Sequence, residues 1–179
     1  MHITVQIKDK SFELYISEKE IQDAIKEVAG KINSDYKNEE VVFVGVLNGS
    51  FMFASDLMKE VDLPCEISFV KVQSYKGVSS TGKVHELIGL TTDIKDKHVV
   101  IVEDIVDSGL TLSKIYSMID HHAPKSVQVA TLLYKPTAFK GKIPPKYFGL
   151  EIPNKFIVGY GLDYLEEGRN TRDIYQIIE

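Results

Sequence analysis

Cysteine is almost absent from this chain, which has 179 residues and only one cysteine, Cys65. A single cysteine cannot form an internal disulfide, and it fits a reducing compartment. Long apolar runs are missing too: no segment approaches the length of a membrane span, and the N-terminal residues lack the apolar stretch of a secretory signal. We therefore expect a cytoplasmic protein without a membrane segment.

An excess of basic residues is also missing. The formal net charge is −5 and the isoelectric point is near 5.6, whereas a nucleic-acid-binding protein carries a basic footprint. There is no internal repeat and no low-complexity segment. The hydrophobic content of 44% is ordinary for a globular protein that buries a proper core, so we expect residues 1–179 to form a single domain.

The most informative stretch runs from residue 97 to residue 112. It opens with four consecutive β-branched apolar residues, 99–102, a pattern typical of a strand buried on both faces of a parallel sheet. Glu103 and Asp104 close that strand, Asp107-Ser108-Gly109 forms a turn, and a helical pattern begins at Leu110. Residues 41–47 and 126–134 predict further buried strands, so we expect an α/β fold with a parallel sheet flanked by helices.

The turn at residues 107–111 has several features of a phosphate-binding site. A helix N-terminus attracts phosphate, Gly109 lets the backbone approach an anion, and hydroxyls such as that of Ser108 can donate to its oxygens. A P-loop lysine is absent. The neighbouring carboxylates would repel a bare phosphate but suit sugar hydroxyls or a divalent cation. Each acidic residue alone could be an ordinary turn residue; together they favour a ribose-phosphate site.

Three other segments allow a functional and a plain interpretation. Asn48-Gly49-Ser50 joins a strand to a helix, which is either a second anion site or a simple turn. The polar segment 73–83 holds two glycines and is either a surface loop or an active-site lid. Lys135 follows the strand 126–134, at the end of a sheet where α/β proteins bind ligands, or it is simply solvated.

The rest of the chain predicts scaffold. Residues 3–7 and 12–16 alternate around a short polar turn, which predicts a hairpin, and Ser17-x-x-Glu20 is a capping box that opens a helix. Cys65 begins a predicted strand and is expected to be a small buried hydrophobe. Residues 137–155 contain three prolines and predict an irregular connection.

The sequence from Val102 to Leu112 resembles the phosphoribosyl-pyrophosphate (PRPP) motif of type I phosphoribosyltransferases, in which two acidic residues precede a D-[ST]-G-x-T loop. Residues 155–164 and Arg169 resemble the purine-binding hood of the hypoxanthine-guanine branch. Residues 47–50 resemble the family's pyrophosphate loop, although the family often has lysine where this chain has Asn48.

This resemblance implies the type I phosphoribosyltransferase fold, with a core at about residues 35–150 and a small hood from about 1–16 and 151–179. It also implies purine salvage: transfer of the phosphoribosyl group from PRPP to hypoxanthine, and to guanine, giving IMP or GMP and pyrophosphate, with Mg²⁺ as cofactor. A homodimer or homotetramer is implied as well.

The resemblance further implies roles for individual residues. Glu103 and Asp104 would hold the ribose hydroxyls, Asp107 would be the general base, and the loop around it would cradle the 5′-phosphate. A non-proline cis peptide is implied at Leu47-Asn48. The implied sets are as follows: PRPP, Glu103, Asp104, Asp107, Ser108, Gly109, Leu110 and Thr111; pyrophosphate, Leu47, Asn48, Gly49 and Arg169; lid, Ser74 and Tyr75; purine, Lys135, Phe156, Ile157 and Asp163; metal, Asp163, Glu103 and Asp104.

Two other classes of protein share part of this pattern. Regulatory proteins with this fold bind PRPP or nucleotides as a signal, but they usually add a nucleic-acid-binding element or a basic face, and this acidic chain has no spare length for either. A flavodoxin-like binding module would not explain the acidic pair together with the hood.

Overall fold

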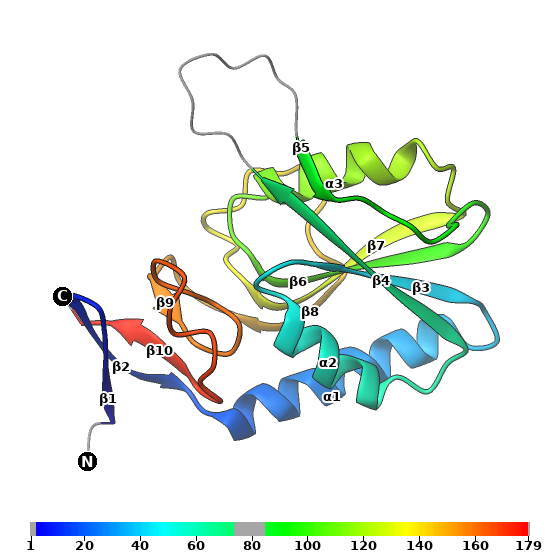
Figure 1. Cartoon of the computed structure of the whole chain (residues 1–179). Coiled ribbons are helices and arrows are strands. Elements are labelled where there is room, and N and C mark those ends of the chain that lie inside the picture. Colours follow the sequence, from blue (N-terminus) through cyan, green and yellow to red (C-terminus); the bar gives the residue numbers. More distant parts are fainter. Residues whose placement is uncertain (1–2, 74–84, 179) are drawn as a thin grey trace.

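The computed structural model of the chain describes residues 3–73 and 85–178, and it contains one large and one small β-sheet (Figure 1). The large sheet has six strands in the order β5-β4-β3-β6-β7-β8. Five of them run parallel, and β5 pairs antiparallel with β4 at one edge. The strands are β3 (Val41–Val46), β4 (Cys65–Gln73), β5 (His85–Ile88), β6 (His98–Val106), β7 (Ser126–Tyr134) and β8 (Tyr147–Glu151).

Helices cover both faces of the large sheet, as the buried apolar strands predict. Helices α1 (Glu18–Asp35) and α2 (Phe51–Glu60) pack on one face, and α3 (Leu110–Asp120) packs on the other (Figure 1). All six residues of β3 are buried. The parallel α/β arrangement predicted from the sequence is therefore confirmed.

The predicted start of the first helix is also confirmed. The Ser17 hydroxyl accepts a hydrogen bond from the Glu20 backbone N–H at 3.4 Å, and the Glu20 carboxylate accepts one from the Ser17 N–H at 2.9 Å. This reciprocal capping box satisfies two backbone donors that a helix N-terminus would otherwise leave unpaired.

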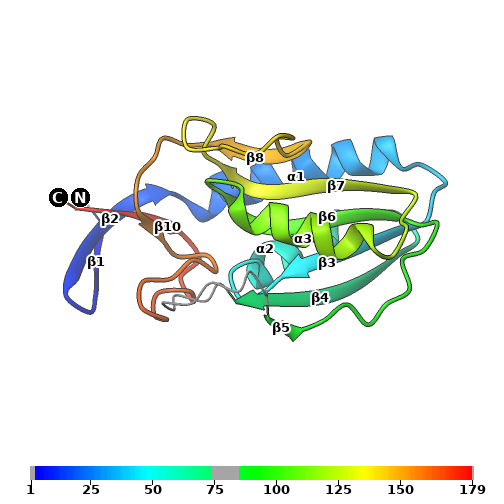
Figure 2. The same cartoon turned by 90° about the horizontal axis from the view of Figure 1, so that it is seen from above.

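The small sheet combines segments from opposite ends of the sequence. Its order is β1-β2-β10-β9, with β1 (Thr4–Ile7), β2 (Lys10–Ile16), β9 (Ile157–Val158) and β10 (Ile174–Ile177). The predicted hairpin is its first pair of strands. Figure 2 shows the small sheet lying beyond the carboxyl ends of the parallel strands, where an α/β sheet binds its ligands.

Two details differ from the sequence-based expectations. Residues 137–155 are not wholly irregular, because β8 lies within them and pairs with β7. Prolines lie on either side of this short edge strand, and proline usually indicates a loop, so the residue pattern did not predict a strand here. Cys65 is exposed rather than buried, since it starts β4, a strand near the edge of the sheet with β5 pairing only its far end.

The predicted lid falls largely outside the structure: Ser74 and Tyr75 lie outside the described residues. Among the helices of the described part, none is long and apolar enough to cross a membrane.

Candidate active site

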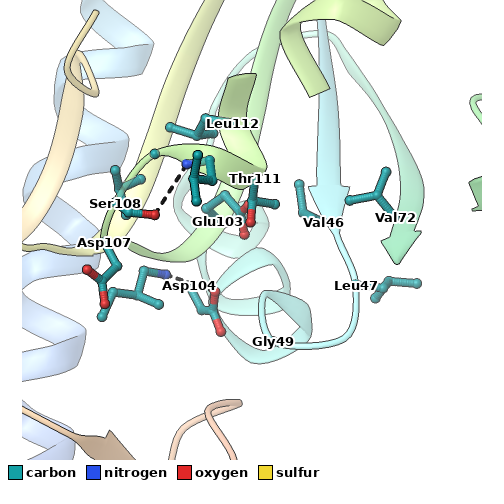
Figure 3. A pocket seen from close by; sticks show the side chains of 14 residues that line it. Val46, Leu47, Gly49, Val72, Glu103, Asp104, Asp107, Ser108, Thr111 and Leu112 are labelled. Atoms are coloured by element: carbon teal, nitrogen blue, oxygen red, sulfur yellow. Dashed lines mark hydrogen bonds between the residues drawn. The ribbon is translucent and has the colours of Figure 1, made fainter. Parts of the chain in front are cut away.

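A pocket of about 320 Å³ lies where β3 and β6 end (Figure 3). Each strand leads into a tight turn and then a helix, so two helix N-termini meet at this edge of the sheet. The lining residues are Val46, Leu47, Gly49, Val72 and the continuous segment 103–112. The predicted PRPP motif therefore forms most of the wall, and two residues of the predicted pyrophosphate loop complete it.

The segment before α3 is shaped by Gly109. This residue has φ = +81° at the N-cap of the helix, a conformation that favours glycine. A Cβ there would also lie 2.6 Å from the Phe139 ring. The Ser108 hydroxyl accepts a hydrogen bond from the Leu110 N–H at 3.4 Å. The first turn of α3, whose backbone N–H groups have no partner within the helix, lines the pocket. This arrangement is suited to an anion.

The loop after β3 packs tightly against the acidic pair. The Leu47-Asn48 peptide bond is cis, as the resemblance implies. A Cβ on Gly49 would lie 1.8 Å from the Asp104 carboxylate, so a larger residue here would displace the Asp104 side chain (Figure 3). The Asn48 side chain points to β4, where its Oδ1 accepts a hydrogen bond from Lys71 Nζ at 3.1 Å.

Glu103 and Asp104 are in unusual surroundings for carboxylates. Glu103 is only 6% exposed, and burial, with the nearby Asp104 charge, raises its pKa well above the usual value. Burial also raises the pKa of Asp104 to about 6, opposed by the hydrogen bond that its carboxylate accepts from the Ile105 N–H. The ionised form of such carboxylates is stabilised by ligand hydroxyls that donate hydrogen bonds to them, or by a cation.

Lys135 and Asp107 form an ion pair at the rim of the pocket. Lys135 is 6% exposed, and its Nζ lies 3.1 Å from Asp107 Oδ2 and 3.4 Å from Asn154 Oδ1. The predicted specificity residue and the predicted base are thus in direct contact. Asn154 was not foreseen, because nothing in the Pro153-Asn154-Lys155 sequence marks it as a partner.

Asp163 and Arg169 form the second ion pair of the site. Arg169 Nη2 lies 2.7 Å from Asp163 Oδ1 and 3.1 Å from Glu166 Oε2, and Nη1 donates to the Gly161 carbonyl at 2.8 Å. Both charges also act on Asp104: that of Arg169 lowers its pKa and that of Asp163 raises it. The hood pair therefore lies near the acidic pair, although neither residue lines the pocket.

The remaining purine-site candidates lie on the hood strand β9 and just before it. Ile157 is buried, whereas Phe156 is 47% exposed. The Phe156 ring lies 5.8 Å from Tyr164 and 6.3 Å from Phe12, which fixes one side of it and leaves apolar surface open. Neither residue lines the pocket, and Asn48 and Lys135 do not line it either.

The site offers oxygen ligands for a divalent cation but no complete cage. Among the residues whose side chains the structure describes, no group of three or more His, Cys, Asp or Glu could hold a metal ion by itself. The carboxylates of Glu103, Asp104 and Asp163 are nonetheless the hard ligands that Mg²⁺ prefers, and Mg²⁺ usually takes most of its ligands from water and substrate phosphates. The residues therefore fit a metal ion that arrives with its substrate.

Comparison with known proteins agrees with this geometry. The family model described as phosphoribosyl transferase domain matches residues 16–165. Among solved structures, a hypoxanthine phosphoribosyltransferase from Staphylococcus aureus superposes with a TM-score of 0.87 at 41% identity, covering 93% of this chain and 91% of the other.

Curated relatives narrow the assignment. A hypoxanthine-guanine phosphoribosyltransferase from Staphylococcus epidermidis is 45% identical over 87% of each chain. A hypoxanthine phosphoribosyltransferase from Salmonella typhimurium is 42% identical over 93% of this chain and 95% of its own. The chain therefore belongs to the phosphoribosyl transferase family, in the hypoxanthine-guanine branch that the sequence motifs resemble.

Proposed function

We propose that the chain is a purine salvage enzyme that transfers the 5-phosphoribosyl group from PRPP to hypoxanthine and guanine, releasing pyrophosphate and giving IMP or GMP. The observation that carries this proposal is the pocket itself, in which the acidic pair and the N-terminus of α3, with Gly109 as its N-cap, form one continuous wall. Carboxylates suit the hydroxyls of a sugar, and the helix N-terminus suits its phosphate.

The PRPP half of the site is assigned to three groups of residues. The backbone around Ser108, Gly109, Leu110 and Thr111 holds the 5′-phosphate. Glu103 and Asp104 accept hydrogen bonds from the ribose hydroxyls. These bonds replace water and so offset the cost of burial that raises the pKa of both carboxyl groups. Leu47, Asn48, Gly49 and Arg169 receive the pyrophosphate.

Departure of pyrophosphate leaves positive charge on the ribose, as in glycoside chemistry. Asp104, whose pKa of about 6 leaves it ionised at neutral pH, would lie beside the sugar and stabilise that charge electrostatically. Bound Mg²⁺, held by Asp163 and by Glu103 or Asp104, would neutralise charge on the leaving pyrophosphate. Arg169 would have to exchange its contact with Asp163 for one with pyrophosphate.

The base half of the site is assigned to Lys135, Asp107 and the hood. Phe156 offers the exposed ring face on which a purine can stack, and the backbone at Ile157 meets its edge. Lys135 donates to the 6-oxo group of the purine, and Asp107 removes the imidazole proton as the new bond forms. Their ion pair opens when the base enters, so each group exchanges one partner for another.

A direct assay tests the proposal. Purified protein is incubated with IMP and pyrophosphate, with and without Mg²⁺, and loss of IMP with formation of hypoxanthine is followed by chromatography. We expect pyrophosphate-dependent and Mg²⁺-dependent loss of IMP. No loss under any condition would remove the proposed activity. A cytoplasmic location and a homodimer or homotetramer stay predictions, the first based on the single cysteine and the second on family resemblance.

A further inference from the structure

Binding pyrophosphate next to this pocket poses a problem of charge. Pyrophosphate is strongly anionic, and the pocket wall itself carries three acidic residues, Glu103, Asp104 and Asp107. Two of the cations that contact site residues are already paired with carboxylates: Lys135 with Asp107, and Arg169 with Asp163. The pyrophosphate loop has the neutral Asn48 where a lysine would have supplied charge.

Lys71 is a third cation at this place, and it donates a hydrogen bond to a neutral side chain, that of Asn48. Its Nζ donates to Asn48 Oδ1 at 3.1 Å, and it makes no ion pair with a carboxylate among the residues whose side chains the structure describes here, 3–72 and 88–178. A lysine ammonium only donates, so the amide oxygen of Asn48 must face it, which leaves the amide N–H groups for another acceptor.

The sheet register places Lys71 beside the loop. Strands β3 and β4 are paired to Val46 and Val70, and the Leu47 N–H donates to the Val70 carbonyl at 2.9 Å. Lys71 is the next residue of β4, and its other neighbour, Val72, lines the pocket. The Lys71 backbone therefore lies at the edge of the site, and its partly exposed side chain reaches Asn48 of the adjoining loop.

We propose that Lys71 is a positioning residue for the pyrophosphate half of PRPP. Its ammonium fixes the Asn48 carboxamide with the N–H groups available to the ligand, and its positive charge beside the neutral loop attracts an anion. The lysine that this loop lacks in sequence is thus supplied from the neighbouring strand. This inference rests on the proposed function, since it presupposes that pyrophosphate binds at the loop 47–49.

The test separates charge from hydrogen bonding. Lys71→Gln keeps a donor for Asn48 but removes the charge, Lys71→Arg keeps the charge, and Lys95→Gln removes one exposed positive charge elsewhere as the matched control. We expect Lys71→Gln to raise the KM for PRPP and the calorimetric Kd for pyrophosphate with Mg²⁺ about tenfold, a change equivalent to about 1.4 kcal/mol. The KM for hypoxanthine and the melting temperature should stay unchanged, and Lys71→Arg and Lys95→Gln should resemble the native chain.

A double variant provides the decisive comparison. Adding Asn48→Lys to Lys71→Gln returns the positive charge to the loop itself, and it should restore most of the pyrophosphate affinity. Native pyrophosphate affinity in Lys71→Gln, an equal loss in Lys95→Gln, or no recovery in the double variant would overturn the proposal. If Lys71→Gln melts at a lower temperature, the recovery in the double variant still decides.

The two proposals can fail separately. A native chain that binds pyrophosphate but forms no nucleotide would refute the proposed activity, while the binding data on the Lys71 variants would still test the positioning role. If the native chain forms nucleotide and Lys71→Gln binds pyrophosphate as tightly as the native chain, the proposed activity stands and the positioning role of Lys71 is refuted.

Discussion

At the scale of single residues, the contact between Lys135 and Asp107 ties the predicted specificity residue to the predicted base. Sequence reasoning placed both at the carboxyl ends of neighbouring strands but could not foresee the ion pair. The pair compensates the charge of a lysine that is almost completely buried. A substitution at either residue also breaks the ion pair, so its effect has to be compared with that of a substitution at the other residue.

Asp107→Asn should keep PRPP binding and lose rate. The amide is nearly isosteric with the carboxylate but cannot accept the proton of the base, so kcat should fall on the order of 10²-fold, the usual scale for a general base. Steady-state kinetics across neutral pH checks this. A kcat equal to that of the native chain at every pH would remove Asp107 from the role.

Lys135→Gln should weaken discrimination between hypoxanthine and adenine. An ammonium has no acceptor to offer the adenine amino group, and a site built around such a hydrogen bond can reject the wrong analogue by about 10⁴-fold. Glutamine can present either an oxygen or an amide N–H, so kcat/KM should fall for hypoxanthine and the ratio between the two bases should shrink.

The control for this experiment is Asp107→Asn, which lacks the same ion pair but keeps the lysine. It should retain the native preference for hypoxanthine. Equal discrimination in Lys135→Gln and the native chain would place specificity elsewhere, most simply in the backbone near Ile157.

At the scale of elements, the hood and the core touch through two glycines. Gly161 has φ = +98°, and a Cβ on it would lie 2.1 Å from the Gly49 carbonyl oxygen. Gly49 in turn packs against Asp104. The three segments that would surround pyrophosphate are therefore stacked without room for a methyl group.

Gly161→Ala should push the hood away from the pyrophosphate loop. The added methyl group meets backbone rather than a flexible side chain, and the positive φ disfavours alanine as well, so we expect a loss of about 1–3 kcal/mol in stability and at least tenfold in kcat/KM for PRPP. Chemical denaturation and kinetics measure the two effects. Gly30→Ala is the matched control, because nothing lies within 4 Å of a Cβ there; native behaviour of Gly161→Ala would contradict the packing argument.

The sequence predicted correctly those elements in which the local residue pattern and the burial in the folded protein favour the same secondary structure. The capping box at Ser17, the hairpin and the buried strand before Glu103 are examples, since propensity and burial favour the same state in each. Strand β8 and the exposure of Cys65 were missed because both depend on where a strand lies in the sheet. The contact between Asp163 and Arg169 was missed because it depends on the path of a loop.

At the scale of the whole molecule, the acidic pair links function to stability. The folded state raises the pKa of Asp104 to about 6, above the usual value of about 3.9. The ionised group is thus disfavoured by folding. Its cost to stability is present above pH 6 and disappears as the pH falls below about 4, where the carboxyl is protonated in both the folded and the unfolded chain.

Asp104→Asn should therefore stabilise the protein without ligand at pH 7.5 while weakening PRPP binding. The amide oxygen can still accept the Ile105 N–H, and the buried charge is gone, so we expect a gain of about 1–2 kcal/mol at pH 7.5 that shrinks toward zero at pH 4. Urea unfolding at both values of pH measures it. The exposed Asp62→Asn serves as control, and a gain that is the same at pH 4 would show that it does not come from ionisation.

The small sheet has a consequence for the order in which the protein becomes complete. Strand β2 pairs with β10, and the Glu18 N–H donates to an Asp173 carboxylate that lies 155 residues further along the chain. A ribosome makes a chain from its N-terminal end, so the first hairpin leaves the ribosome with one edge unpaired and waits for almost the whole remaining sequence. The core strands and the phosphate-binding turn can assemble before that moment, but the wall that would receive the purine cannot. A chain whose translation stops early would therefore hold a sugar-phosphate pocket without a place for the base, and release of the last strand is the event that makes the enzyme.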